Sequence, residues 1–259
     1  MEPVVLYKKI GETPLACMER YRLDSGIDGD VSMTYAGRLD PLAEGVLLVL
    51  VGDAVYKKEK YLSLDKEYVV DILLGVSTDT HDVLGLVTAI SGAGSEASPA
   101  LDPHTHISKI KSILSGLVGT RTQKYPRFSS RTIFGKPLFS WARQGKLRDE
   151  DIPSRKVTIY DINFVNITQI SRDDLIRNVR EKIDSVDGDF RQAQIISRWQ
   201  EVFGDVKTEQ SYSVLTIQVS CSSGTYMRTL AQEIGQLLSI PALAFNIKRL
   251  RVGSFTIDS

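Results

Sequence analysis

The chain has 259 residues, of which 42% are hydrophobic and 25% are charged, and its formal net charge is zero. This composition is typical of a globular protein with a sizeable core, and any polyanionic partner must be held by local basic patches. Two distant cysteines, Cys17 and Cys221, indicate neither a disulfide framework nor a zinc site, and favour a reducing cytoplasm. Without an apolar run near the roughly 20 residues of a membrane span, and without a signal-peptide pattern, we expect no membrane association.

The N-terminal part of the chain predicts a strand, a helix and then a carboxylate on a stiff turn. Residues 4–10 have strand character and residues 14–21 have helix character. Because Pro41 follows it, Asp40 is pushed out of the helical region, while Pro41 suits the first position of a short helix. Residues 46–51 predict a buried strand or helix. Asp40 is therefore either an N-cap or a reactive group mounted before an apolar run.

The middle of the chain predicts a strand followed by a loop. Residues 66–76 alternate in character, with Tyr68 on the same face as residues 70, 72 and 74, and an aromatic residue at a strand start usually belongs to the core. His104 and His106 follow a Gly/Ser/Pro-rich stretch, residues 91–103, and no third ligand stands at a recognisable spacing. We therefore expect no metal site there.

From residue 119 to residue 148, a stretch that we call the basic run, every charged residue is basic. Aromatic residues are interleaved with the eight cations: Tyr125, Phe128, Phe134, Phe139 and Trp141. Cations neutralise phosphate and rings stack on splayed bases, so this pattern favours an RNA-binding segment. The alternative is a solvated basic face.

The C-terminal part predicts strands and helices in alternation. Residues 156–165 and 213–221 predict strands, and the helical spacing of residues 173–186 and 190–203 predicts a helical hairpin between them.

An amphipathic helix is expected over residues 225–238, with Arg228 in its first turn beside the apolar stripe. A cation there opposes the positive end of the helix dipole and needs an anion. The candidates are Asp40 and a substrate phosphate, and the alternative is a free surface arginine.

Five stretches carry a resemblance to a known family. In order they are KIGETP at residues 9–14, GRLDPLAEGVL at 37–47, KEY at 66–68, STDTHDVLG at 77–85 and CSSGTYMRTL at 221–230. They resemble the motifs of the TruB family of tRNA pseudouridine synthases, from about Lys9 to about Val252. The resemblance implies an α+β fold, with a mixed, largely antiparallel sheet flanked by helices and an active-site cleft across its middle.

The same resemblance implies a domain organisation. Residues 1–259 would form a single catalytic domain, with a thumb-like insertion at about residues 119–148 that closes on RNA. Bacterial members usually have little between the strands that flank residues 171–210, so we interpret that stretch as a helical insert. Many members continue into a small C-terminal RNA-binding domain of the PUA type, which we do not expect here.

The family motifs assign roles to individual residues. Asp40 would be the catalytic carboxylate, Arg228 would pair with it, and Tyr68 would stack on the target uracil. Ile247 would line the uracil pocket, and Lys9 would support the site. The other expected substrate-binding residues are Tyr35, which replaces a histidine typical of bacterial members, Tyr226, and in the basic run Lys124, Arg127, Arg131 and Arg143. Asp79, His81 and Asp82 belong to a family stretch with no metal role.

The resemblance implies an isomerase that converts the uridine at position 55 in the T loop of tRNA to pseudouridine. No cofactor or metal is expected, and the protein would act in the cytoplasm, as a monomer. The carboxylate could attack C1′, add to the base or abstract a sugar proton, and the sequence leaves these routes open. Two other hypotheses are a non-catalytic RNA-binding or RNA-folding protein with this fold and a module of a guide-RNA complex.

Overall fold

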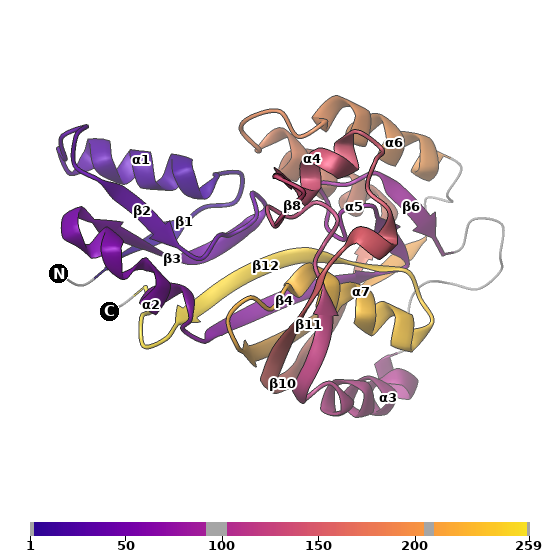
Figure 1. Ribbon diagram of the computed structural model, residues 1–259. Coiled ribbons are helices and arrows are strands. Elements are labelled where there is room, and N and C mark those ends of the chain that lie inside the picture. The colour runs from indigo at the N-terminus through magenta and orange to yellow at the C-terminus, as the bar shows by residue number, and fades with distance from the viewer. Residues whose placement is uncertain (1–2, 92–102, 205–209, 258–259) are drawn as a thin grey trace.

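The computed structural model describes residues 3–91, 103–204 and 210–257 (Figure 1). The first elements are β1 (Val4–Lys8), α1 (Pro14–Asp24), β2 (Met33–Ala36), β3 (Ala43–Val51), the 3-10 helix η1 (Gly52–Lys57), α2 (Lys58–Leu62), β4 (Lys66–Leu74), β5 (Val76–Thr78) and β6 (Val87–Ile90). They are followed by α3 (Pro103–Gly116), β7 (Gly119–Lys124), β8 (Thr132–Ile133), β9 (Lys136–Pro137), α4 (Leu138–Arg143) and the 3-10 helix η2 (Asp149–Asp151). The last are β10 (Ser154–Ser171), α5 (Arg172–Asp184), α6 (Gln192–Gly204), β11 (Ser211–Cys221), α7 (Met227–Leu238) and β12 (Ala242–Val252).

One long sheet carries the fold. Within the described residues it has the order β1-β3-β12-β4-β11-β10-β7, and β2 pairs with β3 on the edge opposite β1. The β3–β12 pair is parallel, whereas the other pairs in this sheet are antiparallel. The short pairs β5–β6 and β8–β9 stand apart from it. This arrangement confirms the expected α+β class and the mixed, largely antiparallel sheet.

Apolar layers form on both faces of the central strands. α3 and α7 pack on one face, where the residues of β4 that share a face with Tyr68 are buried, as the strand alternation predicts. α5 and α6 cover the other face, where Leu73 is buried. Burial of each large apolar side chain stabilises the fold by about 1.5–3 kcal/mol. None of the helices in the described ranges is long and apolar enough to cross a membrane.

The predicted helical hairpin is confirmed as α5 and α6. Ser171 caps α5 because its hydroxyl accepts the Asp174 N–H, and the apolar stripe of α5 is buried against the sheet. Trp199 of α6 stacks on Phe203 at a ring-centroid distance of 5.5 Å, and its indole N–H donates to the Gly85 carbonyl. Both helices therefore belong to the second core layer.

Two expectations need adjustment, and a third falls mostly outside the described residues. Pro41 begins no helix: residues 41–42 form a turn that leads directly into β3, because the Ala43 N–H donates to the Asp40 carbonyl. Residues 119–124 of the basic run form the edge strand β7, paired with β10, so the excursion from the sheet begins only at Tyr125. Most of the predicted loop at residues 91–103, and the side chains of His104 and His106, lie outside the described residues.

A glycine in β3 makes the parallel pairing possible. Gly45 has a φ of +107° and lies opposite Arg249 of β12, and a Cβ placed on it would lie 2.1 Å from the Arg249 carbonyl oxygen. Gly145 also has a positive φ, +66°, but a Cβ there would meet no atom within 4 Å. Both glycines have a positive φ, but only Gly45 has no room for a Cβ, so a comparison of the two positions separates backbone strain from steric clash.

We expect Gly45→Ala to lower the free energy of unfolding by at least about 3 kcal/mol, because strain and a backbone clash add. Gly145→Ala should cost only the left-handed strain, about 1 kcal/mol. Urea unfolding of both variants measures the difference. Equal losses would contradict the close β3–β12 approach.

Candidate active site

A cavity of about 960 Å³ opens where the loop between β2 and β3 meets β4, the start of α7 and β12. The parallel register explains why these segments converge, since Ile247 of β12 lies opposite Ala43 and Arg249 lies opposite Gly45. Residues 37–42, which we call the Asp40 loop, therefore lie beside the end of β12. The cavity is large enough to hold a nucleotide.

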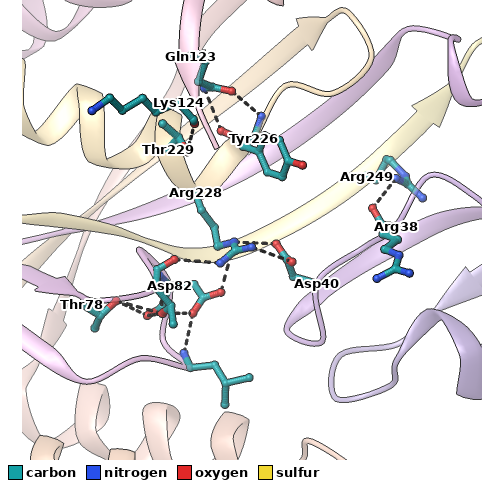
Figure 2. A network of polar contacts seen from close by, with 12 residues as sticks. Arg38, Asp40, Thr78, Asp82, Gln123, Lys124, Tyr226, Arg228, Thr229 and Arg249 are labelled. Atoms are coloured by element: carbon teal, nitrogen blue, oxygen red, sulfur yellow. Dashed lines mark hydrogen bonds and ion pairs between the residues drawn. The ribbon is translucent and has the colours of Figure 1, made fainter. Parts of the chain in front are cut away.

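Asp40 and Arg228 meet in this cavity (Figure 2). Arg228 Nη2 donates to Asp40 Oδ1 at 3.0 Å, and Nε approaches Oδ2 to 2.8 Å. The Arg228 side chain is 4% exposed and that of Asp40 is 39% exposed. A buried cation thus holds a carboxylate that remains accessible from the cavity. Of the two anions that the sequence suggested for Arg228, Asp40 and a substrate phosphate, the structure shows contact with Asp40.

Two buried cations hold the Asp40 loop through its backbone carbonyls. Arg249, 1% exposed, donates from its Nη atoms to the carbonyls of Gly37 and Arg38 and from Nε to that of Val46. Lys8, which is fully buried, donates to the carbonyls of Pro41 and Ala43 at the other end of the loop, and to that of Lys9. The loop is fixed through its backbone, so the Asp40 side chain is free to pair with Arg228.

The lysine that supports the site is Lys8, whereas the sequence favoured Lys9. Successive side chains of a strand point to opposite faces, so Lys8 at the end of β1 points inward. Lys9 is exposed, does not line the cavity, and only its backbone N–H donates, to Glu12. The expectation for Lys9 is corrected accordingly.

A second carboxylate, Asp82, lies beside Arg228. Its Oδ2 lies 3.6 Å from Arg228 Nε, and its Oδ1 accepts from Thr80 Oγ1 and from the Leu84 N–H (Figure 2). Burial raises the pKa of the Asp82 carboxyl to about 6, although Arg228 opposes this shift. Sequence reasoning gave Asp82 no role in the site, and the signal that could have found it is the STDTHDVLG stretch itself.

The acids and histidine of that stretch do not converge. Asp79 pairs with Arg191, Asp82 faces Arg228, and burial lowers the pKa of the His81 imidazole to about 4. Among the described residues no group of three or more His, Cys, Asp or Glu side chains could hold a metal ion.

The aromatic and apolar walls of the cavity contain the four residues that sequence reasoning expected there: Tyr35, Tyr68, Tyr226 and Ile247. Tyr68 is 8% exposed, and burial raises the pKa of its phenol. Tyr226 packs edge to face on Tyr125 at 5.4 Å, and both its backbone groups bond to the Gln123 amide (Figure 2). These rings give one side of the cavity an apolar surface.

Only part of the basic run reaches the cavity. Arg131 and Arg143 line it, whereas Lys124 and Arg127 do not. Arg127 pairs with Asp149 and donates to the Leu147 carbonyl, because tertiary structure supplies acids that the run itself lacks. Arg143 likewise faces Asp189, with Nη1 3.6 Å from Oδ2.

Two further arginines were missed by sequence reasoning. Arg249 fixes the Asp40 loop, and Arg155 of β10 lines the cavity with its guanidinium against Gly224, where a Cβ would lie 1.9 Å from Arg155 Nη1. Among the described residues no acidic side chain pairs with Arg155 or with Arg131. Arg131 and Arg155 therefore face the cavity as cations that are not neutralised by a described acidic side chain.

Comparison with known proteins places the Asp40 loop and the turn at residues 79–82 within a matched family region. A family model described as TruB family pseudouridylate synthase (N terminal domain) matches residues 29–185. The tRNA pseudouridine synthase B of Syntrophus aciditrophicus is 29% identical over 99% of this chain, and that of Listeria monocytogenes is 31% identical over 97%. The chain spans 64% and 66% of the lengths of these two relatives.

Solved structures share the fold. A chain of a Cbf5-Nop10-Gar1 complex matches with a TM-score of 0.57 and 18% identity, covering 99% of this chain and 50% of that one. A chain of an H/ACA RNP bound to a substrate RNA containing 2′-deoxyuridine matches with a TM-score of 0.54 and 17% identity, covering 99% and 49%.

The raised pKa of Asp82 predicts a pH-dependent stability. Between about pH 4 and pH 6 the folded chain keeps a proton that the unfolded chain has released, so folding becomes less favourable as pH rises through this window. Asp82→Asn cannot titrate. The free energy of unfolding of the unmodified protein, minus that of the variant, should fall from pH 4 to pH 6 and level off above pH 7.

Urea unfolding at a series of pH values measures this difference. His81, whose pKa lies near 4, titrates in both proteins, and its contribution cancels if the substitution leaves it unchanged. A difference that stays constant with pH would show that folding leaves the pKa of Asp82 unchanged.

Proposed function

The chain belongs to the TruB family of pseudouridylate synthases, and from this premise we propose that it converts the uridine at position 55 in the T loop of tRNA to pseudouridine. The observation that carries the proposal is the contact of Asp40 with Arg228 inside a cavity lined by Tyr68 and Ile247. The names of the curated relatives, which describe tRNA pseudouridine synthases, support the substrate class.

The reaction breaks the bond between C1′ and N1 of a uridine, turns the freed uracil and rejoins it through C5. An ionised carboxylate serves each of three routes, as a nucleophile at C1′, as a nucleophile on the base or as a base toward a sugar proton. Arg228 pairs with the Asp40 carboxylate through its opposite charge and a hydrogen bond. Nη1 of Arg228 also donates to the Thr80 carbonyl, a second contact that holds the guanidinium beside Asp40.

The uridine must leave its stack to reach Asp40, which costs a few kcal/mol. Tyr68 offers a ring to stack on the uracil, and Ile247 offers an apolar contact from β12. Tyr35 adds a further ring and a hydroxyl to the wall of the cavity. The apolar walls offset the loss of base stacking.

Phosphate recognition falls to the cations that lack acidic partners. Arg131 lies over the Tyr125 ring at 5.4 Å and faces the cavity, as does Arg155. Guanidinium groups placed among aromatic rings suit a splayed RNA loop. We place the protein in the cytoplasm, as a monomer bound to the T stem-loop of tRNA, and its two buried free cysteines are compatible with a reducing compartment.

Asp40→Asn should abolish pseudouridine formation on unmodified tRNA and leave RNA affinity nearly unchanged, because the amide keeps the size of the side chain but cannot serve as base or nucleophile. The variant should still fold but unfold at a lower temperature, since buried Arg228 keeps only Asp82 as a carboxylate partner. Tritium release from labelled uridine measures the reaction. Asp30→Asn, in an exposed loop, is the matched control and should be fully active. Turnover of Asp40→Asn within tenfold of the unmodified protein would refute the catalytic assignment, and an inactive unmodified protein that binds tRNA would favour RNA binding alone.

Arg131→Gln should weaken tRNA binding and reduce the slope of log affinity against log salt by about one, because one phosphate contact is lost. Arg148→Gln is the control within the basic run, since Arg148 is already paired with Glu150 and Asp151 and does not line the cavity. Its slope should not change. Equal slopes for both variants would contradict phosphate binding at Arg131.

A further inference from the structure

The loop between α5 and α6, residues 185–191, reaches the cavity although no step of the proposed reaction uses it. We call this segment the hairpin loop. Asp189, Phe190 and Arg191 line the cavity. The family match ends at residue 185, so most of the hairpin loop and all of α6 lie outside it. A segment that lies mostly outside the family match therefore lines the cavity.

One connection runs from the hairpin loop to Arg228. The Arg191 guanidinium contacts both carboxylate oxygens of Asp79, at 3.1 and 3.4 Å, with the two side chains about one-fifth exposed. Asp79 begins the 79–82 turn, whose Thr80 carbonyl accepts from Arg228 at 3.0 Å and whose Asp82 also faces Arg228. Arg191 therefore fixes the turn that orients the partner of Asp40.

A second connection runs from α5 to β12. Lys182, 9% exposed, donates to the Phe245 carbonyl at 2.8 Å and to the Asn246 side chain, and its ammonium lies 3.6 Å from the centre of the Phe245 ring. The β12–β4 register shifts at this point, between Ala244 and Asn246. Lys182 thus stabilises the irregularity that immediately precedes Ile247, the apolar wall of the cavity.

A third connection runs through Gly11 to the Asp40 loop. The Gly11 N–H donates to the Pro41 carbonyl at 3.0 Å, and the Gly11 carbonyl accepts from Asp187 at 3.4 Å. A Cβ on Gly11 would lie 2.2 Å from the Ser185 carbonyl oxygen, so the hairpin loop packs directly on this backbone. Gly11 therefore links the hairpin loop to the residue that follows Asp40.

The hairpin loop also contacts the segment after β7. The Arg191 guanidinium lies 4.5 Å from the centre of the Phe128 ring, and Arg143 Nη2 donates to the Asp189 carbonyl at 2.5 Å. These contacts place Arg191 between the 79–82 turn and Phe128. One side chain therefore joins two walls of the cavity (Figure 1 shows α4 near α5 and α6).

From these connections we propose that the α5–α6 hairpin is a positioning element of the active site, and that Arg191 is a positioning residue that acts on Arg228 through the 79–82 turn. The inference rests on the proposed function for its kinetic consequence. Its structural content, that Arg191 holds Arg228 in place, is independent of any reaction.

Arg191→Met tests the proposal because it keeps much of the side-chain length and removes the contact with Asp79. Arg177→Met is the matched control, since Arg177 also belongs to the hairpin and is 67% exposed, and within the described part of the chain its acidic partner is Asp174 on the same helix. Arg191→Lys keeps the charge without the planar two-point contact. Asp79→Asn removes the charge from the other partner and retains an oxygen that can accept the Leu86 N–H.

Two measurements address each variant. Single-turnover pseudouridine formation at saturating tRNA reports the chemical step separately from RNA affinity. Nitrogen-15 NMR of the Arg228 Nε–H, assigned with Arg228→Lys, reports how fast this proton exchanges with solvent. The second measurement needs no RNA and no activity, and a purely stabilising role of the hairpin in the fold would not change it selectively.

We expect Arg191→Met and Asp79→Asn to slow the single-turnover rate about tenfold or more, with RNA affinity within about threefold of the unmodified protein. Arg228 Nε–H exchange should become about tenfold faster in both variants, with Arg191→Lys intermediate. Arg177→Met should match the unmodified protein in both measurements.

Unchanged Arg228 exchange in Arg191→Met and Asp79→Asn would overturn the proposal, and so would a loss confined to RNA affinity, which would make Arg191 a phosphate contact. If the unmodified protein forms no pseudouridine, the proposed function fails, while faster Arg228 exchange in the two variants would still support the positioning role.

Discussion

A buried guanidinium governs the architecture of this site. Arg228 is almost inaccessible, and a charge in that position requires an anion and hydrogen-bond acceptors on several sides. The Asp40 loop supplies one carboxylate, Asp82 supplies another, and the Thr80 carbonyl takes a remaining donor. These groups come from separate parts of the chain. Because leaving Arg228 unpaired would be costly, its contacts hold α7, the 79–82 turn and the Asp40 loop together as one unit. The unit in turn presents Asp40 toward the cavity.

Buried cations hold the backbone around this unit. Lys8, Lys66 and Lys182 are buried, each donates to backbone carbonyls of a loop or strand irregularity, and burial lowers the pKa of each ammonium to about 8. Arg249 does the same for the Asp40 loop. Irregular backbone lacks the hydrogen bonds of helices and sheets, and buried cations with several donors satisfy its carbonyls. The geometry of the site thus depends on buried charged groups that bind backbone carbonyls.

The sequence predicted the fold elements and the central pair better than it predicted their surroundings. The alternation around Tyr68 and the helical spacing around Val179 reflect local burial, which is visible in one segment at a time. The motif resemblance brought Asp40 and Arg228 together correctly in space. The choice between Lys8 and Lys9 depended on the exact end of β1, and the pairing of Arg127 depended on Asp149, beyond the basic run. Such outcomes follow from register and tertiary contact, which a segment does not encode by itself.

The parallel pairing of β3 with β12 has a consequence for how the protein folds. Arg249 bonds to the Val46 carbonyl across 203 positions of the chain, and Ile247 joins the cavity by the same strand pairing. Closing so long a loop is slow, and during synthesis it must wait until β12 has left the ribosome. The pocket therefore stays incomplete on a growing chain, and the strands on either side of β12, β1-β3 and β4-β11-β10-β7, can pair only as two separate parts until β12 joins them. The cavity is complete only once β12 has paired with β3, which places its formation late in folding.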